Sequence, residues 1–208
     1  MTARTARQTQ IIEESLALIA EHGMDGLTYR NLSARFGMSM PAFYRHFPSK
    51  ADVLMGIMEY LDEVGSDVFQ SAREHGTDPL DTLRLVLMGY ARHFSKNGAL
   101  AAALFPDTIG EGTCELHDCV LRHMSANRTR IAELFSECMA AGLVRTDVPA
   151  ERWAFVVMGS LRLEVTQWRL DARRTDLIAR VASLWEDLEK IIRPPSGFAG
   201  LEKPVVGE

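Results

Sequence analysis

Apolar residues recur at intervals of three and four along almost the whole chain, and this spacing restricts the fold more than any other feature of the sequence. Ile12, Leu16 and Ile19 begin the pattern, which places them on one face of an α-helix. No segment alternates apolar and polar residues as a half-buried strand does. With Gly and Pro as boundaries, the sequence predicts an all-α fold with helices over 5–22, 28–35, 39–47, 50–73, 80–96, 98–105, 113–141, 149–173 and 176–192.

Two of these helices are short and are joined through Gly37-Met38-Ser39, which is the layout of a helix-turn-helix. Gly37 permits the tight turn because, lacking a Cβ atom, it adopts positive φ at little cost. Many helical proteins contain such a pair, so the more specific signal is the continuous stretch 27–54. It contains the Gly-Met-Ser turn, the run Tyr-Arg-His-Phe near the end of the second helix, and Lys50 at the start of the next helix.

This stretch resembles the DNA-binding domain of the TetR family of transcriptional regulators, and the match extends over residues 10–54. The resemblance implies an N-terminal three-helix helix-turn-helix DNA-binding domain, residues 1–49. It also implies a C-terminal helical domain for ligand binding and dimerisation, residues 50–195. Residues 196–208 are rich in Gly and Pro, and we expect a flexible tail there.

The charge distribution agrees with this division. The whole chain has a net charge of −5, but residues 1–50 hold six Lys and Arg against four Asp and Glu. The remaining residues hold 17 basic against 24 acidic side chains. A mildly basic head on an acidic body suits a small DNA-binding domain attached to a separate ligand-binding domain.

The predicted DNA contacts lie on and around the helix-turn-helix. Tyr44, Arg45 and His46 form a polar and aromatic group suited to phosphate contacts, although a solvated helix face would look the same. Arg30 is a candidate for base contact, since a guanidinium bonds two acceptors of guanine at once. The start of the second helix offers mainly van der Waals contacts. The full predicted set is Thr28, Tyr29, Arg30, Ser39, Met40, Pro41, Ala42, Tyr44, Arg45, His46 and Lys50.

The resemblance also predicts a homodimer in which the last two helices of each subunit form a four-helix bundle. The helix that starts near 150 is apolar nearly all round from Trp153 to Leu161, so it needs cover on every side. The alternative is that these side chains only cover the core of their own subunit. The predicted interface is Val157, Leu161, Val165, Trp168, Val181, Leu184, Trp185 and Leu188.

By the same resemblance, an effector pocket is expected among the middle helices. Methionine suits such a lining because its side chain adapts to varied ligands, but each member could equally be plain core. The predicted lining is Met58, Met88, Phe94, Leu104, Phe105, Cys119, His123, Met124 and Gln167. Cys119 and His123 are also metal-ligand types, but without a ligand signature we predict no metal site.

Other classes of protein are disfavoured. The chain contains no GxSxG, GxGxxG, HExxH or P-loop sequence, so we predict no enzyme and no cofactor. It has no apolar run of membrane-spanning length, no signal peptide and an odd number of cysteines, which together favour a cytoplasmic protein. The predicted function is a ligand-responsive regulator, a repressor that binds a palindromic DNA operator as a dimer and is released by a small hydrophobic effector. The alternative is a helical small-molecule-binding or redox-sensing protein that does not bind DNA.

Overall fold

The computed structural model describes residues 4–104 and 114–194, and within these ranges the chain contains helices and no strand. The side chains of 24, 102–104, 114–117, 119 and 120 lie outside that description, as does the predicted tail 196–208. The all-α prediction is therefore confirmed. The elements are α1 (Ala6–His22), a 3₁₀ turn (Met24–Gly26), α2 (Tyr29–Phe36), α3 (Met40–Tyr44), α4 (Lys50–His75), α5 (Pro79–Lys96), α6 (Gly98–Leu104), α7 (Cys114–Ala140), α8 (Ala150–Leu170) and α9 (Leu177–Ile192).

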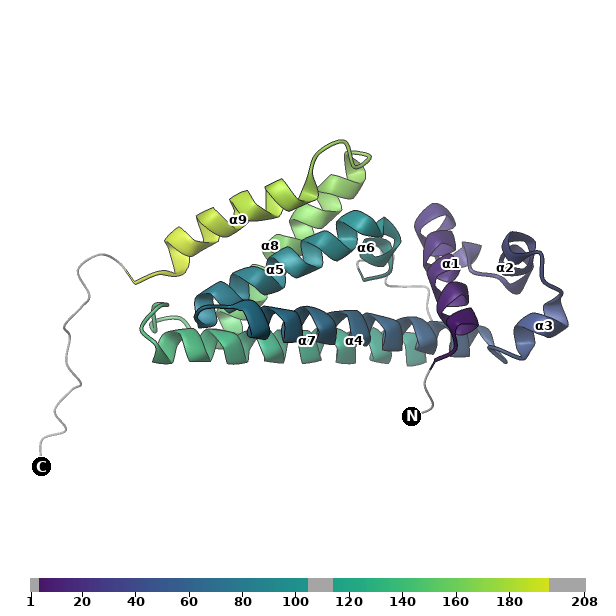
Figure 1. The fold of residues 1–208 in the computed structure, drawn as a ribbon, viewed down its shortest axis with the longest axis horizontal. Coiled ribbons are helices and arrows are strands. Elements are labelled where there is room, and N and C mark those ends of the chain that lie inside the picture. The colour runs from purple at the N-terminus through teal and green to yellow at the C-terminus, as the bar shows by residue number, and fades with distance from the viewer. Residues whose placement is uncertain (1–3, 105–113, 195–208) are drawn as a thin grey trace, which may run out of the picture.

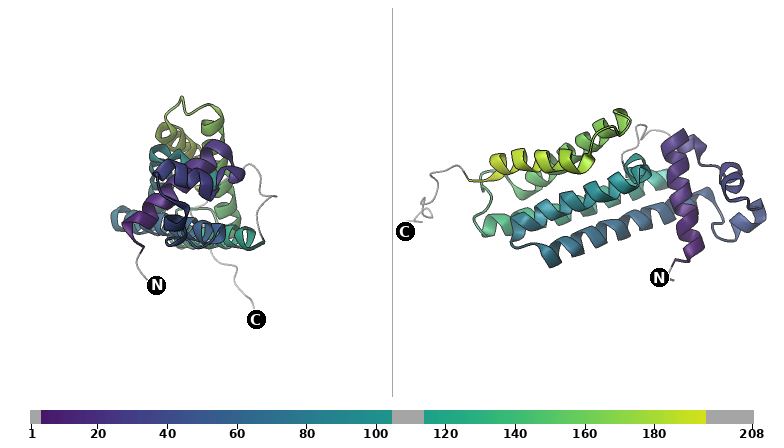
Figure 2. Two further views of the ribbon diagram at one scale, coloured as in Figure 1. Left: turned by 90° about the vertical axis from the view of Figure 1, so that its right-hand side faces the viewer. Right: turned by 45° about the horizontal axis from the view of Figure 1, so that its top comes forward.

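The helices form an elongated molecule with α1, α2 and α3 at one end (Figure 1). We call residues 4–49 the head and residues 50–194 the body. In the body the long helices α4 and α7 run side by side, α5 packs against both, and α8 and α9 complete the bundle (Figures 1 and 2). The head is joined to the body by packing as well as by the chain, because α1 contacts α4 and α6.

Side-chain caps fix where several helices begin. Thr28 accepts a hydrogen bond from the backbone N–H of Asn31 at 3.1 Å. Ser49 caps α4 in the same way, and Asp78 caps α5. Each satisfies a backbone donor that the first helical turn leaves unpaired. Ser39 occupies the cap position of α3, but its side chain makes no capping bond.

Two helices end earlier than their sequence pattern suggests. The helix after Ser39 was expected to include Phe47, but α3 ends at Tyr44. The helix over 149–173 was expected to reach Arg173, but α8 ends at Leu170. Ala172 and Arg173 adopt φ of 52° and 59°, which is left-handed backbone that no α-helix contains.

The left-handed turn after α8 also contacts α6. The guanidinium of Arg173 lies over the ring of Trp168, 5.7 Å from its centroid. A Cβ atom on Gly98, the first residue of α6, would lie 2.4 Å from the Cζ atom of Arg173. The turn between α8 and α9 therefore packs directly on the start of α6.

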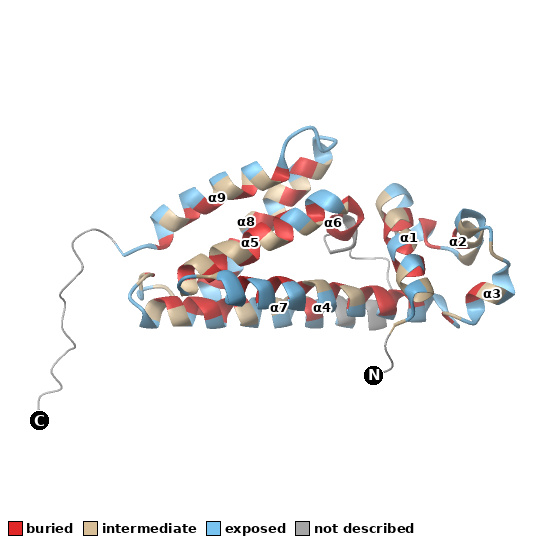
Figure 3. Cartoon of the chain, viewed as in Figure 1, coloured by how far each residue is buried: buried red, intermediate tan, exposed pale blue. Residues whose placement is uncertain are grey.

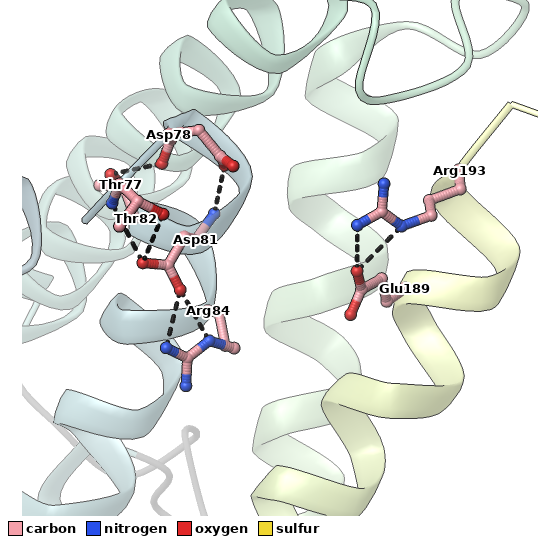
Figure 4. A network of polar contacts seen from close by, with 7 residues as sticks. All are labelled: Thr77, Asp78, Asp81, Thr82, Arg84, Glu189 and Arg193. Atoms are coloured by element: carbon pink, nitrogen blue, oxygen red, sulfur yellow. Dashed lines mark hydrogen bonds and ion pairs between the residues drawn. The ribbon is translucent and has the colours of Figure 1, made fainter.

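The turn between α4 and α5 is held by a polar network around Asp81 (Figure 4). One carboxylate oxygen of Asp81 accepts from the backbone and hydroxyl of Thr77, and the other accepts two bonds from Arg84 at 2.7 and 2.9 Å. Burial alone would raise the pKa of Asp81, but the bonds from Arg84 and Thr77 outweigh it and lower the pKa.

The small core of the head is built from apolar residues on and beside α2 and α3. Leu27, Leu32, Phe43 and Phe47 are buried, and Phe36 packs against them at the edge. Phe43 is fully buried and touches the rings of Phe36 and Tyr29. This core fixes α3 against α2 and α1, so the outer face of α3 is presented in a defined orientation.

Candidate nucleic-acid interface and effector cavity

The outer face of α3 is exposed along its whole length (Figure 3). Met40 and Tyr44 are 40% and 44% exposed, and Ser39, Pro41 and Arg45 are exposed as well. Ala42 and His46 are partly buried. Ser39 makes no capping bond, so its hydroxyl is available as a donor and acceptor at the tip of the molecule.

The two tyrosines of the predicted DNA-contacting set have different roles. The hydroxyl of Tyr29 donates to the backbone carbonyl of Phe47 at 2.7 Å, and burial raises its pKa to about 12. Its ring lies 4.5 Å from the ring of Tyr44. Tyr29 therefore supports Tyr44 from behind, while the side chain of Tyr44 faces solvent.

The basic residues of the head also divide into two groups. Arg35 forms ion pairs with Glu14 and Glu21 of α1, so its charge is balanced within the head. Arg4 pairs with Glu63 of α4 in the same way. Within the described residues, Arg30 and Arg45 form no ion pair or side-chain hydrogen bond, and both are exposed.

Other members of the predicted DNA-contacting set lie nearby. Thr28 is exposed, but its hydroxyl is used as the cap of α2. Lys50 is exposed at the first position of α4. Arg7 is not among the predicted DNA contacts. Its guanidinium lies 4.8 Å from the centroid of the Phe36 ring and contacts the sulfur of Met38. No local pattern connects Arg7 with residues some 30 positions away.

In the body, a cavity of about 60 Å³ lies between α5, α7 and α8. Most of its wall is apolar, and the polar groups are Tyr90, His123 and Asn127. The lining is Val86, Leu87, Tyr90, Phe94, His123, Met124, Asn127, Ile131, Val157, Met158 and Leu161.

A chain of hydrogen bonds links this cavity to α4. His123 is buried, and its Nδ1 lies 2.5 Å from a carboxylate oxygen of Asp62 on α4. The amide nitrogen of Asn127 lies 2.9 Å from Nε2 of His123. The hydroxyl of Tyr90 donates to the amide oxygen of Asn127 at 3.3 Å. This series of hydrogen bonds therefore joins α4, α5 and α7 at the cavity wall.

Of the nine predicted pocket residues, the cavity brings together Phe94, His123 and Met124. Met58 and Met88 are buried elsewhere in the core. Gln167 is exposed and accepts a bond from Arg180, so it faces away from the cavity. The side chains of Leu104 and Cys119, and the whole of Phe105, lie outside the described residues.

The predicted dimer residues belong to the core of the single subunit. All of the eight except Leu184 are buried within one subunit, and Val157 and Leu161 line the cavity. The alternative interpretation, that they cover their own subunit's core, fits these seven. The exposed apolar side chains of α8 and α9 are different residues: Phe155, Val156, Leu163, Leu170 and Ile191.

Neither metal chemistry nor thiol chemistry gains support from the described residues. Within them, no three His, Cys, Asp or Glu side chains are grouped so as to hold a metal ion. Cys138 is buried, and burial raises the pKa of its thiol to about 12. No helix in the described part of the chain is long and apolar enough to cross a lipid bilayer.

The head is similar in sequence to a known family of proteins. Residues 11–56 match the family model described as bacterial regulatory proteins, tetR family. The nucleoid occlusion factor SlmA of Vibrio atlanticus is 26% identical over 138 residues, which cover 65% of this chain and 70% of that protein. The probable acrEF/envCD operon repressor of Escherichia coli is 22% identical over 204 residues, or 92% of this chain and 89% of that protein.

The fold of the whole chain also has solved counterparts. The transcriptional regulator FadR from Bacillus subtilis, solved in complex with stearoyl-CoA, superimposes with a TM-score of 0.76 at 18% identity. The superposition covers 89% of this chain and 99% of the other. At this identity, the likeness shows a shared fold that includes the body as well as the head.

Proposed function

Because this chain belongs to the TetR family of bacterial regulatory proteins, we propose that it is a ligand-responsive transcriptional repressor. In this proposal it binds a palindromic operator as a dimer, and a small hydrophobic effector releases it. The domain formed by residues 1–49 binds DNA, and the domain formed by residues 50–195 binds the effector and the second subunit. A protein with this function works in the cytoplasm, where it meets the chromosome.

The observation that carries the proposal is a group of exposed side chains near α3, including two arginines that form no ion pair within the described residues. Arg30 and Arg45 are exposed and unpaired within the described residues, whereas Arg4 and Arg35 are neutralised by Glu partners. Tyr44, which precedes Arg45 in the chain, is exposed as well, and its ring lies against that of Tyr29. Free cations beside an exposed short helix suit the phosphate contacts that give DNA binding most of its affinity.

The outward face of α8 supports the dimer. Phe155, Leu163 and Leu170 are 62%, 57% and 80% exposed on one helix, and Ile191 on α9 is 55% exposed. Large apolar side chains gathered on neighbouring helices mark a protein-binding surface. A second copy would cover them, so this face replaces the seven buried positions as the proposed interface.

The repressor and effector parts of the proposal rest on the relatives and on the cavity. The relative from Escherichia coli is named as a probable operon repressor, and the FadR structure holds stearoyl-CoA. An apolar cavity at the centre of the body supports an apolar effector here. The alternative of a thiol redox sensor gains nothing from Cys138, since a thiol with a pKa near 12 contains almost no reactive thiolate at neutral pH.

DNA binding is tested by selecting duplexes from a random pool and measuring affinity by fluorescence anisotropy at several salt concentrations. Enrichment of an inverted repeat is expected, and Arg45→Ala should weaken binding to all duplexes and reduce the salt dependence. Arg128→Ala is the matched control, because Arg128 is an exposed arginine on α7, away from both the head and the proposed interface. Binding of this chain to no duplex, or equal losses for both variants, would refute the proposal.

Repression and dimerisation need their own measurements. Transcription in vitro from a template with the selected site should fall when the protein is added, and a rise would indicate an activator. Light scattering should show a dimer that Leu163→Glu converts to a monomer. Leu121→Glu, which changes a leucine on α7 that is 51% exposed, should leave the dimer intact.

A further inference from the structure

The direction of the hydrogen bonds at the cavity wall is fixed by chemistry. The carboxylate of Asp62 only accepts, so Nδ1 of His123 carries the proton and donates. Nε2 of the same ring then has a free lone pair and accepts from the amide N–H of Asn127. The amide oxygen of Asn127 is left to accept from Tyr90. The side chain of Asp62, at the outer end of this series, is 63% exposed.

The hydrogen bond between Tyr90 and Asn127 is the longest and weakest of this series. At 3.3 Å it is long for a hydroxyl donor, which normally lies about 2.7 Å from its acceptor. Both of its residues line the cavity. A group inserted there must accept from the hydroxyl of Tyr90 and donate to the amide oxygen of Asn127. A hydroxyl group does both at once, whereas a carboxylate only accepts and an ammonium only donates.

The electrostatics of the site disfavour an anion. Burial raises the pKa of Tyr90 to about 12, and the carboxylate of Asp62 adds to the rise, while Arg130 opposes it. Negative charge at the Tyr90 oxygen is therefore costly. A ligand carboxylate at the same place would meet the same burial and the same Asp62.

The shape of the site requires the helices to separate when a ligand enters. Drug-sized ligands occupy about 300–1,000 Å³, far more than the 60 Å³ present. On α4, the residue beside the weak bond is Gly65, where an added Cβ would lie 3.1 Å from the Tyr90 oxygen. Opening the site therefore moves α5 and α7 relative to α4, the helix that begins next to α3.

We propose that the effector of this protein is a neutral, mainly apolar molecule with a single hydroxyl group, an alcohol or a phenol, whose hydroxyl inserts between Tyr90 and Asn127. The inference rests on the proposed function in taking the cavity as the effector site. Its ligand class is tested by direct binding, without DNA, so the two ideas can fail separately.

Three probes of similar shape test the head group: 4-ethylphenol, 4-ethylanisole and 4-ethylbenzoate. Each is titrated into the full chain by calorimetry. The phenol should bind at least about tenfold more tightly than the ether, which cannot donate to Asn127, because an unpaired buried acceptor costs about 1–3 kcal/mol. The benzoate should bind more weakly still. Equal affinities, tighter binding of the benzoate, or no binding of either 4-ethylphenol or 1-hexanol at about 1 mM would overturn the proposal.

Two variants tie ligand binding to the site. Tyr90→Phe keeps the ring but removes the donor to the ligand oxygen, so it should weaken the binding of both the phenol and the ether, while the phenol keeps its preference because it still donates to Asn127. Tyr60→Phe is the matched control, because Tyr60 is a partly buried tyrosine on α4 outside the cavity lining. Gly65→Ala keeps every polar side chain of the hydrogen-bond series, and it should weaken phenol binding because the added methyl group fills the space beside Tyr90. A Tyr90→Phe protein that binds the phenol as tightly as the unaltered protein would overturn the proposal.

The effect on DNA is measured last. Addition of 4-ethylphenol to the protein–operator complex should release the DNA, and the Tyr90→Phe variant should require about tenfold more of it. If the phenol binds with the expected preference and leaves the complex intact, the ligand class stands and the proposed release fails.

Discussion

The candidate functional side chains of the head lie on its surface, whereas those of the body lie in its interior. In the head, the buried residues only hold α3 in place, and the candidate DNA contacts are on the outside. In the body, the candidate effector contacts are on the inside, where Tyr90 and His123 are also core residues. A surface site of this kind tolerates changes in its contacts, whereas a cavity site cannot be altered without affecting stability.

The largest expected effect comes from removing the support of α3. Phe43→Ala empties a fully buried position and should lower the free energy of unfolding by about 3–5 kcal/mol. Because α1 packs on α4 and α6, we expect one cooperative denaturant transition for head and body together, with DNA binding reduced. Two separate transitions in the variant would show that the head unfolds alone and would weaken the picture of a packed junction.

A pair of arginine variants separates contact residues from supporting residues within the head. Arg30→Ala should cost about 1–3 kcal/mol of operator affinity and leave thermal stability unchanged. Arg35→Ala should do the reverse, with a loss of stability below about 1 kcal/mol, since its ion pairs are partly exposed. Equal losses for Arg30→Ala on operator and random DNA would make it a phosphate contact rather than a base contact.

Tyr29→Phe tests the supporting role assigned to the inner tyrosine. The variant loses the hydrogen bond to the carbonyl of Phe47, which should cost about 1 kcal/mol of stability. DNA affinity in the folded protein should change little, because the Tyr29 ring still supports Tyr44. Denaturant titration and anisotropy measure the two quantities, and a loss of affinity without a loss of stability would return Tyr29 to the set of DNA contacts.

The smallest expected effect is at the far end of the body. The folded protein holds the pKa of Asp81 below its ordinary value, so this carboxylate stabilises the fold above about pH 4. That contribution is lost as the pH falls through the lowered pKa. Asp81→Asn should therefore cost less than about 1 kcal/mol at pH 7, and the difference from the unaltered protein should shrink below pH 4. A difference that stays constant down to pH 2 would contradict this assignment.

The sequence predicted local features well because their causes are local. The starts predicted for the helices over 50–73 and 80–96 lie close to the observed ones, because Ser49 and Asp78 each cap a backbone group only three residues away. The end of α8 was placed three residues late, because the turn at Arg173 depends on contacts with Trp168 and α6. Tyr29 was assigned to the DNA surface for a related reason, since its partner Phe47 lies 18 residues away.

The cavity and the interface were harder to predict, because periodicity gives the apolar face of a helix and not the neighbour that covers it. Val157 and Leu161 are on the apolar face that was assigned to a second subunit, and both line the cavity. Nothing in the sequence pointed to a role for Asn127, because a single amide on a polar helix face becomes significant only through its contact with Tyr90, 37 residues earlier. The outward positions Leu163 and Leu170 were passed over because α8 is apolar on nearly all sides.

The contact between Arg173 and Gly98 has a consequence for the evolution of this chain. Any side chain at position 98 displaces the guanidinium, since its Cβ would lie 2.4 Å from Cζ. The displaced guanidinium would no longer lie over the Trp168 ring, so a mutation in α6 would change the packing of the turn after α8. Substitutions at position 98 should therefore become neutral in lineages where residue 173 has already become short. Among descendants of this sequence, the two positions are expected to change in that order and to be inherited together.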